Sequence, residues 1–366
     1  MSIPSEKVNG AQLISLIYMI RIIPAAIVFP TLLAVQMAQD LWIATLAGAV
    51  LAVLIVMPLL FLGLKFPEQT IIQYSQTVLG NIPGKVVGLI LIIYWLKIAA
   101  DVIYAIGDAF TLAVMPETPI WVFTVLIAFM GAYTARHGLE VIGRISLNFM
   151  AIIVLVGILV TVMPFEAAKV KNLLPVLENG LQPLVKPVLV NLSFWAQLVV
   201  IGMLLPHLNR IRDSVRFSGY ALLITGIQIL LFSITLTVVF GVTAKDLSLP
   251  AYSLVRMIRV ARFLERIEII VLISWTLAAA AKLALMLWAG SLGLVQIFGS
   301  SNYSALVYPL GIVCIIAAHL LHDNHMEYMS TLVQSAPFIV ITVAALIIIL
   351  AFGWLVRRNS DSTGGI

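Results

Sequence analysis

Long apolar stretches alternate with short polar segments along almost the whole chain. A helix needs roughly 20 apolar residues to cross a hydrocarbon core of about 30 Å, and we count about ten stretches that meet or approach this length. They cover residues 11–35, 42–62, 86–114, 120–133, 145–163, 187–205, 217–242, 267–288, 305–321 and 337–356, and the fourth is the shortest. The pattern therefore predicts a bundle of about ten transmembrane helices.

The composition leads to the same conclusion. Of the 366 residues, 62% are hydrophobic and 10% are charged, and the mean hydropathy is +1.12. This leaves too few polar side chains to cover the surface of a water-soluble globule. Only helices and closed barrels satisfy their backbone in lipid, and these stretches are continuously apolar instead of alternating. We expect an all-α membrane protein in which residues 1–366 form a single integral membrane domain.

Basic residues in the loops predict the orientation. Ten spans would place both chain ends on one side of the membrane, and ten Lys and Arg residues fall on that side against eight on the other. The eight come from two longer connections, whereas the short loops 35–42 and 115–119 carry none. Both termini are therefore expected to be cytoplasmic, with residues 358–366 as a polar tail. The net charge of +5 then reflects topology, and we expect no nucleic-acid partner.

Charged and aromatic residues share one face of the stretch 86–114. Tyr94, Lys97, Asp101, Tyr104 and Asp108 follow one another at spacings of three, four, three and four, which places them on a single helix face. A charge at bilayer depth is costly unless it meets a partner or a wet cavity. We expect this face to point into the bundle, and Asp101 to pair with Lys97 one turn away.

The buried charges have two interpretations, and both stay open at this point. In the first, a fixed cation replaces a bound sodium ion or carboxylates relay protons, and the residues that would couple ions or protons are Arg21, Lys97, Asp101, Asp108 and Lys282. In the second, they form a salt-bridge network that fixes the helix register.

Two spans carry residues that interrupt helices. Pro24 and Pro30 fall in the first span, and each removes a backbone donor. The sixth span, which has the same rank in the second set of five, carries several polar or helix-breaking residues: Asn191, Ser193, Gln197, Gly202 and Pro206. Paired interruptions point to inverted repeats with a binding site near the bilayer midplane. The alternative is that the prolines only kink packed helices.

Motifs of catalysis or metal binding are not recognisable in the sequence. His319, His322 and His325 recur at every third position, so on a helix they progress around its surface instead of converging on one ion. The chain contains neither an H-E-x-x-H pair, nor a phosphate-binding glycine loop, nor a G-x-S-x-G elbow. We expect no metal, no cofactor and no enzymatic activity.

Four groups of residues resemble a known family. The first group is Phe66, Pro67, Ile71, Tyr74, Leu79, Gly80, Gly84 and Gly88; the second is the segment 172–183; the third is the segment 263–268 with Trp275; the fourth is Gln12 with Pro30. Together they resemble the endospore germination permeases, the B subunits of spore germinant receptors, within the amino acid–polyamine–organocation transporter superfamily. The matches follow the family's order from end to end.

The resemblance implies a leucine-transporter-like 5+5 inverted repeat of ten helices, in which helices 1 and 6 are broken around a small-molecule site. Repeat one would cover about residues 10–163 and repeat two about 186–357. It also implies A-type and C-type receptor subunits as partners, a small germinant such as an amino acid as ligand, and a location in the inner membrane of the spore or in the cell membrane.

Carried onto this chain, the resemblance implies a set of ligand-binding residues in three helices. These are Ile23, Pro24, Ala25 and Ala26 in the first, Tyr94 and Lys97 in the third, and Phe194, Trp195, Ala196 and Gln197 in the sixth. The segment Ile23-Pro24-Ala25 departs from the glycine-rich stretch of many members. Because proline lacks a backbone donor, a smaller and more apolar site is an alternative.

Three functions remain open from the sequence. The first is a nutrient-sensing receptor subunit on a transporter scaffold, with or without conduction of ions or solute. The second is an autonomous proton-coupled amino-acid transporter. The third is a scaffold that has lost its ligand site.

Overall fold

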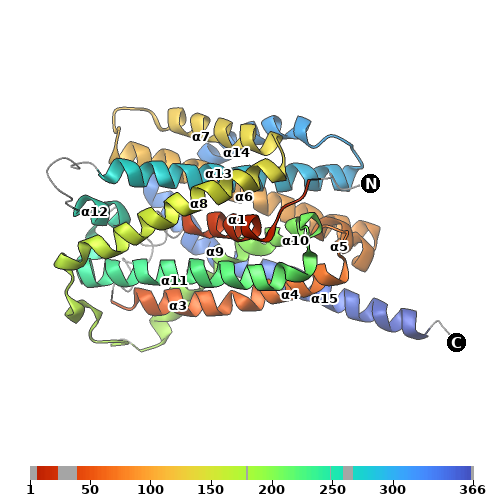
Figure 1. Ribbon diagram of the computed structural model, residues 1–366, viewed down its shortest axis with the longest axis horizontal. Helices are drawn as coiled ribbons and strands as arrows, with labels where there is room; N and C mark the ends of the chain where they lie inside the picture. The colour runs from red at the N-terminus through yellow and green to blue at the C-terminus, as the bar shows by residue number, and fades with distance from the viewer. Residues whose placement is uncertain (1–5, 24–38, 179, 248, 259–266, 364–366) are drawn as a thin grey trace.

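The computed structural model describes residues 6–23, 39–178, 180–247, 249–258 and 267–363. Helices form almost all of these residues, and the β-structure among them is one isolated bridge between Val8 and Leu208. The helices run side by side along the long axis of the molecule (Figure 1). This confirms the expected all-α architecture.

The first half of the chain contains seven α-helices within the described residues. They are α1 (Gly10–Ile23), α3 (Leu41–Leu51), α4 (Val53–Lys65), α5 (Ile71–Leu79), α6 (Asn81–Ala113), α7 (Ile120–Arg136) and α8 (Leu139–Val162). Helices α3 and α4 meet at Ala52, whose backbone is itself right-handed helical, so they form one continuous apolar span.

The second half begins with a span of mixed helix type, formed by α9 (Val185–Ala196), the 3₁₀ helix η5 (Gln197–Val200), α10 (Ile201–Leu204) and a 3₁₀ turn at Leu205–His207. It is followed by α11 (Ser214–Phe240), α12 (Pro250–Arg256), α13 (Ile267–Phe298), α14 (Ser304–Leu321) and α15 (His325–Thr363). Further 3₁₀ turns occupy Met163–Ala167, Val170–Leu173, Gln182–Leu184, Ile211–Asp213 and Gly241–Asp246.

Every predicted span coincides with a helix in the described residues. Eight helices are long and apolar enough to cross a membrane, and the shorter apolar helices α1 and α7 occupy the predicted first and fourth spans. Their buried and exposed surfaces are both apolar, as expected in lipid. Helix α15 continues to Thr363 and so includes most of residues 358–366, whose cytoplasmic position stays a prediction.

The first described residues close one end of the bundle. Glu6 Oε2 accepts a hydrogen bond from the Leu139 backbone N–H at 2.6 Å, and Glu6 Oε1 accepts one from the Tyr303 hydroxyl at 2.8 Å. Burial, together with the negative charge of Glu6, raises the pKa of Tyr303 and keeps its hydroxyl protonated as a donor. The described residues at the amino end and the end of α15 lie at the same end of the molecule (Figure 1).

The segment 172–183, one of the family-like motifs, covers the opposite end of two spans. The Asn172 side-chain amide donates to the Val238 carbonyl near the end of α11 at 3.0 Å. The Leu177 backbone N–H donates to the Asp40 carboxylate just before α3 at 3.1 Å. These contacts attach the connection to both helix ends.

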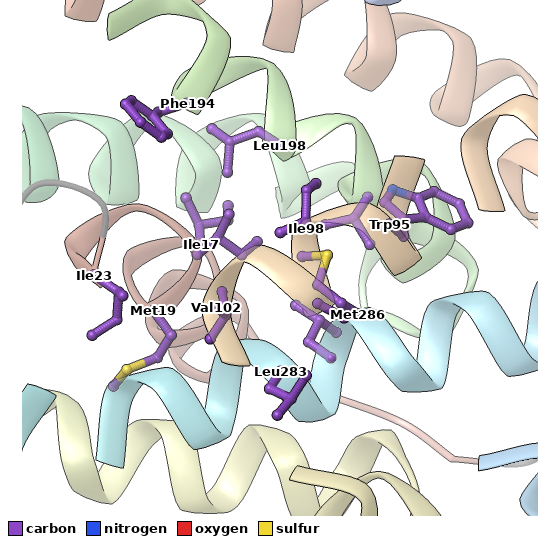
Figure 2. Packing of buried hydrophobic residues seen from close by; sticks show 14 of the residues in the cluster. Ile17, Met19, Ile23, Trp95, Ile98, Val102, Phe194, Leu198, Leu283 and Met286 are labelled. Atoms are coloured by element: carbon purple, nitrogen blue, oxygen red, sulfur yellow. The ribbon is translucent and has the colours of Figure 1, made fainter. Parts of the chain in front are cut away.

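The interior is built where four spans meet. Helix α1 packs against α8, α11, α13 and η5, and α6 packs against α13, α7 and α14. Figure 2 shows Phe194 and Leu198 of the sixth span approaching Ile17 of α1, with Val102 of α6 and Leu283 of α13 completing the core. Most of α1 is inaccessible to solvent. The first, third, sixth and eighth spans therefore enclose the centre of the bundle.

Candidate functional site

The sixth span changes its helix type where an interruption is expected. Helix α9 ends at Ala196, and η5 begins at Gln197, whose φ of −58° and ψ of −21° remain in the right-handed helical region. A 3₁₀ helix has about three residues per turn instead of 3.6, so side chains after Ala196 turn out of the α-helical phase. The interruption predicted at Phe194–Gln197 is thus present as a tightening of the helix and not as extended chain.

The first span reaches the same level in the bundle. Helix α1 ends at Ile23, and Pro24, Ala25, Ala26 and Pro30 lie outside the described residues. Their predicted contribution to a binding site therefore stays a prediction.

A partly open cavity lies where these two spans meet α6, α13 and α15, with about 300 Å³ of empty space when the space at its mouth is counted. The described residues that line it are Ile23, Ile98, Asp101, Val102, Ala105, Phe194, Gln197, Lys282, Tyr328 and Leu332. Most of the lining is apolar, and a few polar groups converge on it. This combination is typical of sites that bind small organic molecules.

Lys282 supplies a buried positive charge to this cavity. Its side chain is 1% exposed, and its ammonium nitrogen donates to the Gln197 side-chain carbonyl at 2.7 Å. A buried ammonium is costly unless it is hydrogen-bonded and neutralised. The charged groups that interact electrostatically with Lys282 are Arg21 and Asp101. Lys282 is thus placed to meet whatever occupies the cavity.

Arg21 lies beside the cavity on α1 and is fully buried. Its guanidinium donates to the Asn191 side-chain carbonyl and lies 4.9 Å from the centre of the Trp195 ring. Asn191 in turn donates its amide hydrogens to the Ala44 carbonyl at 3.0 Å. The polar residue that interrupts the sixth span therefore connects α1, α3 and α9. The Asn191 amide and the Trp195 ring can thus both stabilise the positive charge of Arg21.

Asp101 is the carboxylate at the cavity wall, and it connects three parts of the chain. Lys97 Nζ lies 2.6 Å from Asp101 Oδ2, which confirms the predicted pairing one turn apart. His322 Nε2, from the link between α14 and α15, lies 3.3 Å from Asp101 Oδ1. The Tyr328 hydroxyl donates to the Asp101 backbone carbonyl at 3.4 Å. Asp101 is buried, so the polar face of α6 does point into the bundle.

The remaining histidines form two further contacts between helices. His325 Nδ1 lies 2.6 Å from Asp108 Oδ2, and His319 Nε2 lies 3.0 Å from Thr124 Oγ1. The sequence suggested a role for these histidines only as metal ligands, and it did not reveal that His322 and His325 meet the carboxylates of α6. A signal was available in the sequence, because Asp101 and Asp108 each require a partner inside the membrane and the end of the ninth span carries His322 and His325.

The structure brings together part of the predicted site. Ile23, Phe194 and Gln197, expected to bind ligand, and Asp101 and Lys282, expected to couple ions, all line the cavity. Tyr94, Lys97, Trp195 and Ala196 are not among its described lining residues, and Asp108 contacts His325 beyond it. The sequence analysis did not propose the following lining residues: Ile98, Val102, Ala105, Tyr328 and Leu332.

A second cavity, also partly open, lies between α1, α8, α11 and α13, with about 460 Å³ of empty space when the space at its mouth is counted. Its described lining contains no charged side chain, and its polar members include Gln228, Thr161 and Ser274. Trp275, part of a family-like motif, also borders this space. The smaller cavity therefore holds the charged groups that the sequence pattern singles out.

Comparison with known proteins identifies the family. A family model described as "Spore germination protein" matches residues 7–326. The chain belongs to this family. It is 23% identical over 362 residues to Spore germination protein YndE of Bacillus subtilis (strain 168), covering 97% of this chain and 98% of the relative. It is 25% identical over 340 residues to Spore germination protein KB of the same organism, covering 89% and 90%.

Solved structures establish the fold. MhsT, solved in complex with L-phenylalanine, matches with a TM-score of 0.68 and 13% identity, covering 92% of this chain and 87% of MhsT. Mhp1, a nucleobase-cation-symport-1 family transporter with bromovinylhydantoin bound, matches with a TM-score of 0.60 and 15% identity, covering 93% and 78%. These matches confirm the leucine-transporter-like fold, and the apolar helices make the chain an integral membrane protein. The repeat boundaries stay a prediction.

The partly buried ion pair of Lys97 and Asp101 predicts a measurable coupling. In a double-mutant cycle of Lys97→Gln and Asp101→Asn, we expect a coupling of about 1–3 kcal/mol in the free energy of unfolding, because each single change leaves a buried polar partner behind. The measurement is unfolding of the purified protein in detergent. Glu140 and Arg144 form a matched pair at the same spacing, with 43% and 69% exposed side chains. That cycle should give about 0.2–1 kcal/mol, and equal couplings in both cycles would contradict the prediction.

Proposed function

We propose that the chain is a nutrient-sensing membrane subunit of a spore germinant receptor, which binds a small germinant such as an amino acid in the cavity beside Lys282. The observation that carries the proposal is the convergence of Ile23, Gln197 and Lys282 from three spans on one partly open space. Family membership supports the germination role. The ligands named for MhsT and Mhp1 support a small-molecule site in a protein of this fold.

Binding would be converted into a signal through the contacts around the cavity. The sixth span reaches the cavity at Gln197 and ends at His207, whose carbonyl accepts the Val8 backbone N–H at 2.8 Å. A ligand that displaces Gln197 would therefore act on an element tied to the chain's amino end. Such a shift requires that the ligand bind one arrangement of the span better than another.

A second candidate is an autonomous proton-coupled amino-acid transporter. It is favoured by the row of titratable side chains at Asp101, His322, Asp108 and His325, since histidines and carboxylates in series are typical of proton relays in membranes. If the chain is such a transporter, the fixed positive charges near this row would tune proton binding, and they belong to Arg21, Lys97 and Lys282. The family and fold are those of germination proteins and transporters.

Filling the cavity tests the proposed site. Ala105 lines the cavity on α6, and Ala109, one turn further, is equally buried but is not among the lining residues. We expect Ala105→Leu to weaken ligand binding at least about tenfold because it occupies ligand space. Ala109→Leu is the control for overpacking and should keep the affinity even if it lowers stability.

The measurement is the germination response of spores to a nutrient panel, together with ligand-induced thermal stabilisation of the purified variants. Loss of both responses in Ala109→Leu but not in Ala105→Leu would place the ligand elsewhere.

Uptake distinguishes the receptor from the transporter. Under the proposed function, the chain reconstituted alone into proteoliposomes binds its germinant but does not accumulate it against a gradient, because signalling requires A-type and C-type subunits. We expect these subunits to co-purify with a tagged chain from spore inner membranes. Proton-driven accumulation by the chain alone, abolished by Asp101→Asn, would establish the transporter instead.

The orientation is proposed from the loop charges. Short loops without Lys or Arg at 115–119 support an outer position for that end of the bundle, which leaves both chain ends cytoplasmic. In a growing cell, a green fluorescent protein fused after Ile366 should fluoresce and an alkaline phosphatase fused there should stay inactive. The reverse pair of results would invert the topology.

A further inference from the structure

We propose that the cavity recognises the carboxylate of its ligand through Lys282 and does not require an α-ammonium group. The ligand class is then small monocarboxylates with an apolar chain, of which amino acids are one subset. This inference rests on the proposed function, because it names what the same cavity binds.

The first reason is that Lys282 is a buried charge with a neutral partner. Its described hydrogen bond goes to the Gln197 amide oxygen, and no described carboxylate lies within 4.0 Å of its ammonium nitrogen. Residues 24–38, which follow α1, contain no Asp or Glu. A carboxylate that enters the cavity would form a charge-assisted bond that Lys282 does not make with the described residues.

The second reason is that Asp101 is already engaged. Lys97 lies 2.6 Å from one carboxylate oxygen and His322 lies 3.3 Å from the other. A ligand ammonium would have to compete with both, and it would also approach Lys282. Asp101 is the one carboxylate among the described lining residues and is already paired with Lys97, whereas Lys282 brings a positive charge whose described partner is neutral. The balance favours an anion over a cation.

The third reason is the character of the remaining wall. It consists of Ile23, Ile98, Val102, Ala105, Phe194 and Leu332, together with Tyr328, whose hydroxyl already donates to the Asp101 backbone carbonyl. These side chains suit an aliphatic or aromatic tail and provide no partner for a second charged group. One charged end and one apolar end therefore describe the complementary ligand.

The experiment measures how tightly the purified wild-type protein in detergent binds three ligands that share the same side chain. The first ligand is the amino acid: alanine, valine, leucine or phenylalanine. The second is its deaminated acid: propionate, 3-methylbutanoate, 4-methylpentanoate or 3-phenylpropionate. The third is the amino-acid amide. In at least one series we expect the acid to bind within about tenfold of the amino acid, and the amide to bind at least about tenfold more weakly than either, because the amide lacks the anion.

Variants link this preference to Lys282. Lys282→Gln should weaken binding of the acid by about tenfold to hundredfold, and Lys282→Arg should restore most of it because the charge is kept. Lys186→Gln removes the same charge at an exposed position and should leave the affinity unchanged. If Lys282→Gln fails to fold, the comparison of acid and amide on the wild-type protein still decides the question.

The outcomes separate the two proposals. If an amide binds as tightly as its acid, or a folded Lys282→Gln binds the acid normally, the inference fails and the proposed function stands. If only amino acids bind and their deaminated acids do not, the ammonium is required and the inference also fails. If no compound in any series binds, both proposals fail.

Discussion

Charged side chains in the centre of this bundle must find partners within the protein, because lipid offers none. Three such contacts hold the interior together. Asp101 joins α6 to the link before α15, Arg21 joins α1 to α9 through Asn191, and Lys282 joins α13 to η5 through Gln197. Each contact crosses between spans that are distant in the sequence, and together they surround the cavity. The arrangement of the site thus follows from the need to satisfy buried polar groups.

The change of helix type in the sixth span falls at the cavity. Gln197 is the first residue of the 3₁₀ segment Gln197–Val200, and its side-chain carbonyl accepts the hydrogen bond from Lys282. In this segment each residue advances by a larger angle than in α9. Such segments are frequently found where a helix serves as a hinge. The span is also almost wholly buried, so a change in this segment must be accommodated by its neighbours.

The two kinds of charge in the site differ in how they are neutralised. Asp101 has cationic or titratable partners on both oxygens, which suits a structural role in holding α6 against the last two helices. Lys282 has a neutral amide partner, which suits a group that could pair with an anionic ligand. The salt-bridge interpretation therefore fits the Lys97–Asp101 pair, and the functional interpretation fits Lys282. Under the proposed function, such a division lets a rigid half of the site support a responsive one.

Much of this protein follows from its sequence alone. Lipid demands continuous apolar helices, so the approximate position of every described span could be predicted from hydropathy, although α13 and α15 extend beyond their predicted stretches. The pairing of Lys97 with Asp101 could also be predicted, because residues four apart on a helix are neighbours whatever surrounds them. The four family-like motifs led to the correct family.

Tertiary structure alone decided the rest. The meeting of His322 with Asp101 and of Lys282 with Gln197 joins residues 221 and 85 positions apart, and no local periodicity encodes such a distance. Ile98, Val102 and Tyr328 look like ordinary span residues in the sequence and become cavity walls only through the packing of α6 against its neighbours. Hydrophobicity selects the helices without specifying their partners, whereas contacts between buried polar groups depend on which helices meet.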